Sequence, residues 1–279
     1  MTTVTSPQAP TIPLSERIAR KKVRISLNER LLSWYAIAIF GFLYLPIFIL
    51  IIYSFNANKV VGVWQGFSLQ WYEELFTDRA IASAFKNSIW VATWSTLIST
   101  FLGTMAALVL ERYRFRGRLT FDAVLYLPII IPDIVMALST LLFFVMVGIA
   151  LSRNTILIAH VAFNISFVAV IVRARLATMD GNLEEAAADL GASEWTAFRR
   201  VTMPLLMPGI VAGALLAFTL SLDDFVITFF VSGPGSTTLP VRVYSMIKFG
   251  VTPEVNAIST LMLLGSTILV IISLVIQRR

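Results

Sequence analysis

Six long stretches of apolar residues divide this chain, and polar connections separate them. Each stretch is close to or longer than the roughly 20 residues that carry an α-helix across a bilayer core. The stretches are apolar on all sides, whereas strands of a membrane barrel alternate apolar and polar positions. Because helices satisfy their own backbone hydrogen bonds in lipid, the pattern predicts an all-α membrane protein with six transmembrane helices. The predicted spans are residues 31–53, 84–110, 124–150, 154–176, 208–231 and 257–276.

Composition agrees with a membrane location. Hydrophobic residues make up 57% of the 279 residues, charged residues make up 14%, and the mean hydropathy is +0.82. A soluble domain of this size carries about 25% charged residues. The sequence contains no cysteine, which excludes disulfides, thiolate metal sites and cysteine nucleophiles.

Lysine and arginine predict the orientation. Sixteen of the 22 basic residues lie in the tail 1–30, in the second-to-third and fourth-to-fifth connections, and at the C-terminal end. By the positive-inside rule, both termini and the polar connection 177–207 are cytoplasmic. The net charge of +6 is then explained by basic loops facing anionic lipid, and no nucleic-acid partner is expected.

Two polar segments flank the first predicted span. Residues 1–30 are expected to form a cytosolic, mostly disordered basic tail, followed by a transmembrane domain over residues 31–279. The external connection 54–83 is rich in aromatic residues and predicts a short interfacial helix near residues 69–76. Lipid anchoring is the favoured role for these aromatic side chains, and a surface for an external partner is the alternative. They are Trp64, Phe67, Trp71, Tyr72 and Phe76.

The third predicted span contains Pro128 and Pro132, followed by Asp133. Each proline removes a backbone donor and disturbs the helix, so a bent or partly unwound segment is expected here. Irregular backbone at membrane depth is tolerated where it lines a cavity. A simple packing kink is the alternative.

The connection 177–207 reads as two short helices. Asn182 is expected to cap the first helix, with Glu185 completing a capping-box-like pair. Gly191 is expected to end this helix in a left-handed conformation. The helix carries an apolar stripe with a helical period, formed by Leu183, Ala186, Ala187 and Leu190.

The second short helix is expected to begin at a Ser193 cap and to end at prolines. Pro204 and Pro208 should stop it and restart the chain toward the fifth span. Docking of a cytosolic partner or an amphipathic pair lying on the membrane would both explain the connection. One face of this helix carries Trp195, Phe198 and Val201.

The same connection carries a family signature. Glu185-Ala186-Ala187, then Gly191, then Val201-x-Met203-Pro204 resembles the EAA loop of bacterial ABC-importer permeases. The family favours Ile and Leu where this chain has Val201 and Met203, and both changes are mild. Further motifs are similar to the spermidine/putrescine branch of the family: Gly66-Phe67-Ser68-Leu69, Trp71-Tyr72, Asn87-Ser88, Leu127-Pro128, Ile131-Pro132 and Ser221-Leu222-Asp223-Asp224-Phe225.

The resemblance implies a type I importer fold and a set of partners. A cytosolic ABC ATPase dimer would bind the loop, a second homologous permease would complete the pathway, and a periplasmic binding protein would deliver the substrate. The chain lacks the phosphate loop G-x-x-x-x-G-K-[ST], so ATP hydrolysis is expected from the partner, with no cofactor and no catalytic residue here. The residues implied in coupling are Glu184, Glu185, Ala186, Ala187, Asp189, Gly191 and Pro204.

Three carboxylates fall inside the predicted spans: Asp133, Asp223 and Asp224. Each ionised carboxylate costs at least roughly 2.5 kcal/mol there, so such groups usually face a bundle interior or a water-filled cavity. They are suitable counter-charges for a polyamine. The alternative is that they cap broken helices or pair with a neighbouring subunit. Adjacent helical residues point about 100° apart, so Asp223 and Asp224 are not expected to face one cavity together.

His160 and Asn164 lie on one face of the fourth predicted span. Without cysteine or acidic neighbours in sequence, this histidine predicts an interhelical hydrogen bond, with proton relay as a lesser alternative and no metal site. The favoured function is a polyamine importer subunit in the membrane. An importer of another small solute, such as ferric iron or an organophosphonate, and an ATP-independent secondary transporter are the alternatives.

Overall fold

The computed structural model describes residues 27–60, 62–248 and 250–277. The expected disordered tail 1–30 therefore lies almost entirely outside the described residues. The chain divides into two compact units, residues 1–49 and 50–279. Most of helix α2 (Leu27–Tyr53) belongs to the first unit, and its apolar side chains are largely exposed, as expected for a helix that faces lipid.

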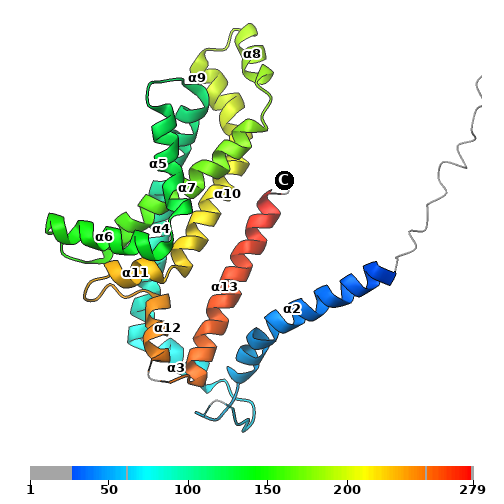
Figure 1. Ribbon diagram of the computed structural model, residues 1–279, viewed down its shortest axis with the longest axis vertical. Helices are drawn as coiled ribbons and strands as arrows, with labels where there is room; N and C mark the ends of the chain where they lie inside the picture. The colour runs from blue at the N-terminus through cyan, green and yellow to red at the C-terminus, as the bar shows by residue number, and fades with distance from the viewer. Residues whose placement is uncertain (1–26, 61, 249, 278–279) are drawn as a thin grey trace, which may run out of the picture. The chain divides into compact units, whose positions relative to one another are not determined.

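The described part of the second unit is helical apart from turns and one isolated β-bridge. Figure 1 shows the helices in chain order by colour. They are α3 (Gln70–Thr77), α4 (Arg79–Arg112), α5 (Arg118–Ile130), α6 (Asp133–Val147), α7 (Arg153–Ala177), α8 (Asn182–Asp189), α9 (Glu194–Ala197), the π-helical turn η1 (Phe198–Thr202), α10 (Met203–Asp223), α11 (Val226–Val231), α12 (Leu239–Ile247) and α13 (Pro253–Gln277).

Helices α4, α7 and α10 form the centre of the second unit and pack closely on one another. Small residues permit this approach, as is common where membrane helices meet. A Cβ atom at Gly103 of α4 would lie 2.8 Å from the Cβ of Val168 on α7. The buried residues between these helices include Ala107, Val168, Ala169 and Ala217.

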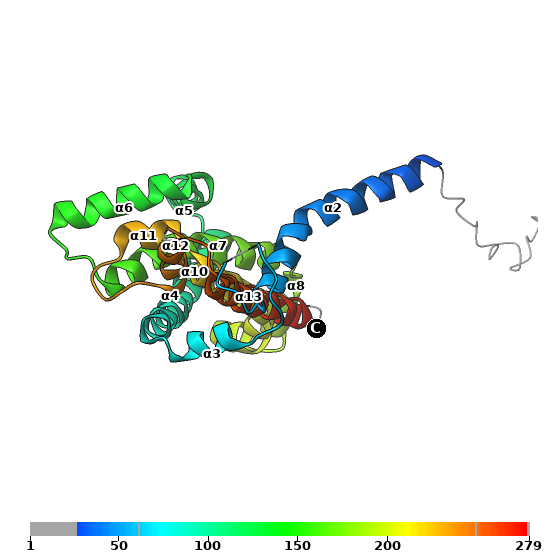
Figure 2. The ribbon, with the colours of Figure 1, turned by 90° about the horizontal axis from the view of Figure 1, so that it is seen from below.

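The predicted spans correspond to five helices of membrane-spanning length and one bent pair within the described residues. The bent pair is α5 and α6, which meet at an angle of 112°. The predicted break in the third span is thereby confirmed. Ile131 is extended, as expected before Pro132, which has no N–H to continue the helix. After the bend, α6 runs alongside α11 in both ribbon views (Figures 1 and 2).

The fifth span differs from the prediction at both ends. Helical structure runs without a stop from Glu194 to Asp223, so neither Pro204 nor Pro208, which lies inside α10, ends the second short helix. The turn η1 widens the helix before Pro204, and the Met203 N–H bonds to the Phe198 carbonyl. Pro204 is the second residue of α10, directly after this wider turn.

The aromatic connection contains the expected helix, α3, close to the predicted range 69–76. The lipid-anchor prediction is wrong for Trp71, which is 3% exposed in a hydrophobic cluster. Its indole N–H donates to the Asn56 carbonyl at 2.7 Å. The prediction stays open for Phe67 and Phe76, whose side chains are exposed.

Candidate functional site

Asp133, Asp223 and Asp224 line one cavity of about 410 Å³. They come from the start of α6, the end of α10 and the break after α10. The expectation that Asp223 and Asp224 cannot share a cavity is wrong, because the helix ends between them. Asp224 is extended, with φ −63° and ψ 124°. The other lining residues are Pro128, Met136, Phe163, Phe167, Thr219, Leu220, Phe225, Val226 and Ile227.

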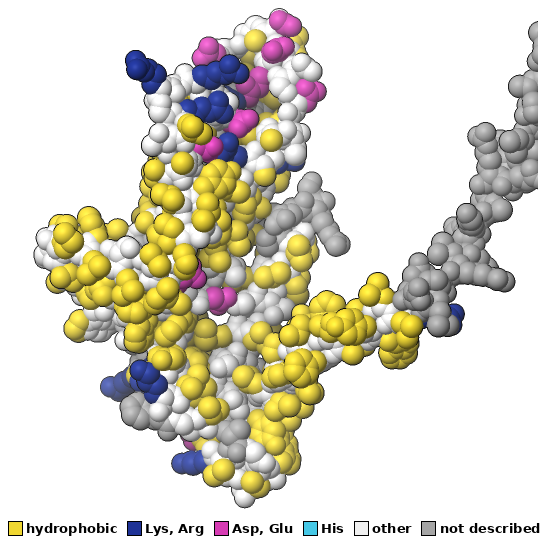
Figure 3. Space-filling view, in the orientation of Figure 1, with side chains coloured by type: hydrophobic (Ala, Val, Ile, Leu, Met, Phe, Trp, Pro, Cys, Tyr) yellow, Lys and Arg dark blue, Asp and Glu magenta, His cyan; other side chains and the backbone are white. Residues whose placement is uncertain are grey.

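The surface around the break is mostly apolar. Figure 3 shows acidic side chains as isolated patches within a hydrophobic band, while most charged side chains gather beyond the two ends of that band. Charge inside the band is unusual for a membrane protein and marks a functional region.

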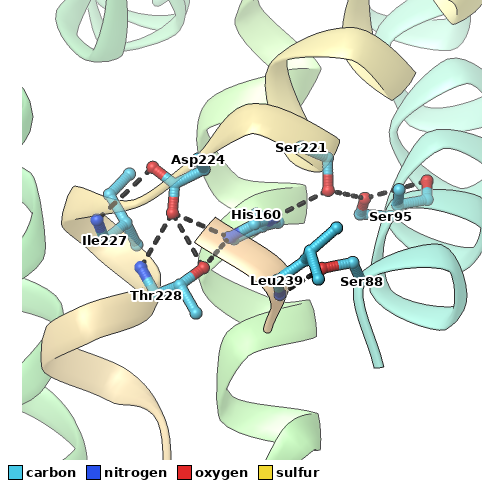
Figure 4. A network of polar contacts seen from close by, with 9 residues as sticks. Ser88, Ser95, His160, Ser221, Asp224, Ile227, Thr228 and Leu239 are labelled. Atoms are coloured by element: carbon cyan, nitrogen blue, oxygen red, sulfur yellow. Dashed lines mark hydrogen bonds and ion pairs between the residues drawn. The ribbon is translucent and has the colours of Figure 1, made fainter. Parts of the chain in front are cut away.

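Asp224 is held by the protein itself. Its Oδ2 accepts hydrogen bonds from the Thr228 N–H and hydroxyl, both at 2.8 Å, and lies 3.2 Å from His160 Nε2. Its Oδ1 accepts from the Ile227 N–H at 3.4 Å. The carboxylate therefore caps α11, which is the alternative considered above for an aspartate at a broken helix (Figure 4).

His160 joins four helices through buried hydrogen bonds (Figure 4). Its Nε2 lies 2.9 Å from the Thr228 hydroxyl on α11, and its Nδ1 lies 2.7 Å from the Ser221 hydroxyl on α10. The Ser221 hydroxyl lies 2.9 Å from that of Ser95 on α4. The predicted interhelical hydrogen bond is confirmed for His160. Asn164 differs, since its buried amide has no hydrogen-bond partner among the described residues.

The sequence does not indicate that His160 has an acidic neighbour in space. Asp224 is distant along the chain, and only the turn after α10 brings it to the histidine. Within the described residues, no group of three potential ligands is placed to hold a metal ion. His160 and Asp224 form a contact between α7 and the break after α10.

The other two carboxylates of the cavity are more open. Asp223 is exposed, and both its oxygens lie 3.2 Å from the Ser266 hydroxyl on α13. Asp133 is exposed and makes no hydrogen bond or ion pair with the described residues. It does not cap α6 with its side chain, contrary to the alternative role considered for it. Both carboxylates are free to accept a ligand cation.

The predicted first short helix of the connection 177–207 is present as α8. Gly191 has φ +81°, as expected for a helix-ending glycine. The Ala192 N–H bonds to the Ala187 carbonyl at 3.0 Å and closes the terminal turn. The predicted Asn182 cap is wrong, because Asn182 is the first residue of α8 and the preceding Gly181 is at the cap position. The Asp180 carboxylate accepts a hydrogen bond from the Asn182 N–H at 3.0 Å.

Helix α8 presents its apolar stripe outward. None of its residues is buried, and Leu190 just after it is 90% exposed. The predicted Ser193 cap on the next helix is confirmed, with the Thr196 N–H donating at 3.3 Å. Trp195 stacks on Phe198 with ring centroids 5.7 Å apart. An exposed apolar stripe of this size on a polar element is suited to docking.

Glu184 differs from its exposed neighbours because it is paired within the chain. Its carboxylate accepts from the Arg112 guanidinium at the end of α4 and from the Thr202 hydroxyl in η1. The Arg112 guanidinium also lies 5.6 Å from the centroid of the Phe198 ring. From the sequence, Arg112 is one of the basic residues in the second-to-third connection, and in the structure its contact with Glu184 ties α8 to α4.

These features define a helical membrane protein with an acidic cavity and an exposed segment that carries an apolar stripe. Residues 99–279 match the family model described as "Binding-protein-dependent transport system inner membrane component". The chain belongs to this family, which confirms the resemblance to ABC-importer permeases. It is a multi-pass protein of the bacterial inner membrane, and the family argues against the alternative of a secondary transporter.

Within the family, the chain is similar to polyamine permeases. It is 44% identical to the spermidine/putrescine transport system permease protein PotC of Escherichia coli (strain K12) over 241 residues, 86% of this chain and 91% of PotC. It is 48% identical to the putrescine transport system permease protein PotI of the same strain over 231 residues, 80% of this chain and 82% of PotI.

The fold has solved counterparts. A crystal structure of a bacterial ABC transporter involved in the import of the acidic polysaccharide alginate contains a chain that matches with a TM-score of 0.72. The match covers 92% of this chain and 96% of that chain at 18% identity. This confirms the predicted permease fold.

Proposed function

We propose that this chain is the permease subunit of an ATP-driven importer for polyamines of the putrescine and spermidine type. One observation carries the proposal: three carboxylates from separate elements meet in one cavity within the apolar part of the protein. The similarity to PotC and PotI supports the same substrate class.

The cavity favours a cation over an anion. Among the described residues, its lining contains three aspartates and no lysine or arginine. An organic ammonium group gains charge-assisted hydrogen bonds from carboxylates, whereas an organophosphonate would meet repulsion. Asp223 and Asp133 are the proposed substrate contacts, because Asp224 is already occupied by Thr228 and His160.

The energy is proposed to come from a cytosolic ABC ATPase dimer that binds α8 and the turn at Gly191. The exposed apolar stripe, and the exposed Glu185 and Asp189 beside it, support such a docking surface. In this arrangement the segment and both termini are cytoplasmic. A second homologous permease completes the pathway, a periplasmic binding protein delivers the substrate, and this chain itself is not an enzyme.

Uptake measurements test the substrate class. Cells that lack other polyamine uptake should accumulate labelled putrescine or spermidine when they express this chain with its ATPase, sister permease and binding protein. Removal of this chain alone should abolish uptake. Accumulation of labelled ferric iron or 2-aminoethylphosphonate, with none of either polyamine, would refute the proposal.

Purification tests the subunit role. A tagged chain solubilised from the membrane should retain an ATPase and a second permease, and ATP hydrolysis by the complex should rise with loaded binding protein. A chain that transports polyamines alone in vesicles would contradict the assembly.

A further inference from the structure

Three aromatic rings form a cluster beside the break in the fifth span. Phe225 precedes α11, Phe229 lies within it, and Tyr244 lies on α12. The ring centroids are 4.6 Å apart for Phe225 and Tyr244, 5.4 Å for Phe225 and Phe229, and 5.9 Å for Phe229 and Tyr244. Phe229 and Tyr244 are 42% and 39% exposed, so part of each side chain is accessible.

A cation already lies on this cluster. The ammonium of Lys248 is 5.0 Å from the Tyr244 centroid and 5.9 Å from the Phe229 centroid. Both distances are within the range of a cation–π contact. Lys248 is exposed and forms no ion pair with any carboxylate of the described residues. The rings of Tyr244 and Phe229 therefore accept the alkylammonium group of Lys248, a flexible side chain without an ion pair among the described residues.

The cluster adjoins the carboxylate cavity. Asp223 and Phe225 line that cavity and also a second one of about 450 Å³. Tyr244 lines the second cavity, as does Ser266, whose hydroxyl donates to Asp223. Asp223, Phe225 and Tyr244 thus border the same space, and Tyr244 joins it to Phe229 and Lys248, which lie outside the lining of both cavities. This combination recognises organic ammonium groups, with charge from the carboxylate and a desolvated face from the rings.

We propose that Phe225, Phe229 and Tyr244 form an ammonium-binding subsite next to the carboxylate cavity, and that Lys248 fills it as a tethered competitor until substrate arrives. The inference rests on the proposed polyamine function and adds a specific subsite to it. One ammonium of the substrate binds at the rings in place of Lys248, while another binds at the carboxylates. A monoamine engages only one of the two positions, so a diamine or polyamine binds more tightly.

The placement of Lys248 at the C-terminal end of α12 offers a competing explanation, since a cation is favourable there. The two explanations differ in one result. If Lys248 only stabilises α12, its removal leaves substrate affinity unchanged or weaker. If Lys248 competes for the rings, its removal tightens binding.

Equilibrium binding decides between them. The assembled importer, purified without its binding protein, is titrated with labelled putrescine and labelled spermidine. Lys248→Gln is expected to lower Kd by about two- to five-fold, the size of an exposed cation–π contact. Tyr244→Leu is expected to raise Kd by about three- to ten-fold, and Tyr244→Phe should stay close to the wild type because the ring remains.

Controls separate the subsite from folding and from the substrate class. Phe143→Leu removes an exposed ring on α6 that has no cation over it among the residues the structure describes, and it should leave Kd unchanged. Cellular uptake by the wild type judges the polyamine function independently, and no uptake of either amine would refute that function. With uptake intact, the subsite is overturned if Lys248→Gln fails to lower Kd, if Tyr244→Leu binds like the wild type, or if the wild-type complex binds neither amine.

Discussion

Asp223 and Asp224 are neighbours in sequence with different surroundings. Asp224 is held by two backbone N–H groups, the Thr228 hydroxyl and His160, whereas among the described residues Asp223 meets only the Ser266 hydroxyl. The same substitution at the two positions should therefore have different effects, one on transport and one on folding.

Asp223→Asn is expected to lower the polyamine uptake rate about ten-fold, because a charge-assisted hydrogen bond is lost. The thermal stability of the purified complex should not change. Asp133→Asn, at a carboxylate without partners in the described chain, should behave in the same way. Normal uptake by both variants would make these residues structural.

Asp224→Asn is expected to lower stability by about 2 kcal/mol, because the cap of α11 and the contact with His160 are weakened. This loss of stability should appear as a lower melting temperature of the complex and a lower amount of protein in the membrane. An Asp224→Asn complex that melts like the wild type but does not transport would instead make Asp224 a substrate ligand.

Sequence reasoning found the three carboxylates and the histidine but not their pairing. The cost of burying charge identifies Asp133, Asp223 and Asp224 within apolar stretches. The cap on α11 depends on where α10 ends, and no pattern in the sequence predicts that end. The contact of His160 with Asp224 follows from where α10 ends, so it could not be predicted.

At the scale of elements, Gly191 controls the end of α8. Its φ of +81° is unfavourable for other L-residues, although a Cβ there would meet no atom within 4 Å. Backbone strain rather than a clash should therefore rank substitutions. Among substitutions at this position, Gly191→Asn is expected to keep the most uptake, Gly191→Ala less and Gly191→Val the least. Asn tolerates the left-handed region best and Val tolerates it least. Equal uptake by all three would show that the turn is not needed for coupling.

The contact between Glu184 and Arg112 joins α8 to α4. Glu184→Arg is expected to reduce uptake several-fold by repelling Arg112, with less than about 1 kcal/mol lost in stability because the pair is partly exposed. Arg112→Glu combined with Glu184→Arg should recover most of the uptake. Glu185→Arg provides the matched control, because Arg112→Glu should not restore uptake to this variant. If Arg112→Glu restored uptake equally to Glu184→Arg and Glu185→Arg, a specific contact between Arg112 and Glu184 would be excluded.

The short helices of this segment were largely predictable, and the turn that follows them was not. Ser193 and Gly191 are strong local signals for a helix start and a helix end. Pro204 was interpreted as a stop because proline breaks an α-helix. The wider turn η1 accommodates it, since Met203 bonds to the carbonyl of Phe198 five positions earlier. Such turns have no comparable sequence signal.

For the whole molecule, the spans and the bend in the third one follow from hydrophobic length and proline. The direction that α6 takes after Pro132 does not, because packing against α11 sets it. The orientation proposed from basic residues can be measured directly, since the chain contains no cysteine of its own.

Single cysteines at exposed positions provide that measurement. Leu190→Cys, on the proposed cytoplasmic side, should react with a membrane-impermeant maleimide only in inside-out vesicles. Phe76→Cys, in the connection after the first span, should react only in right-side-out vesicles. Both side chains are well exposed on this chain, and the measurement uses vesicles without the ATPase, which is proposed to cover Leu190. The reverse pattern would overturn the orientation.

The break after Asp223 also has a consequence for the peptide backbone. The last four carbonyl groups of an α-helix lack partners within the helix, and that end carries roughly half a negative charge. Thr219, Leu220 and Asp223 place this end of α10 at the cavity wall. The N-terminal ends of α6, at Asp133, and of α11, at Val226, line the same cavity and carry the opposite partial charge. The peptide dipoles therefore oppose one another at the cavity wall, and its preference for a cation depends on the ionised aspartates.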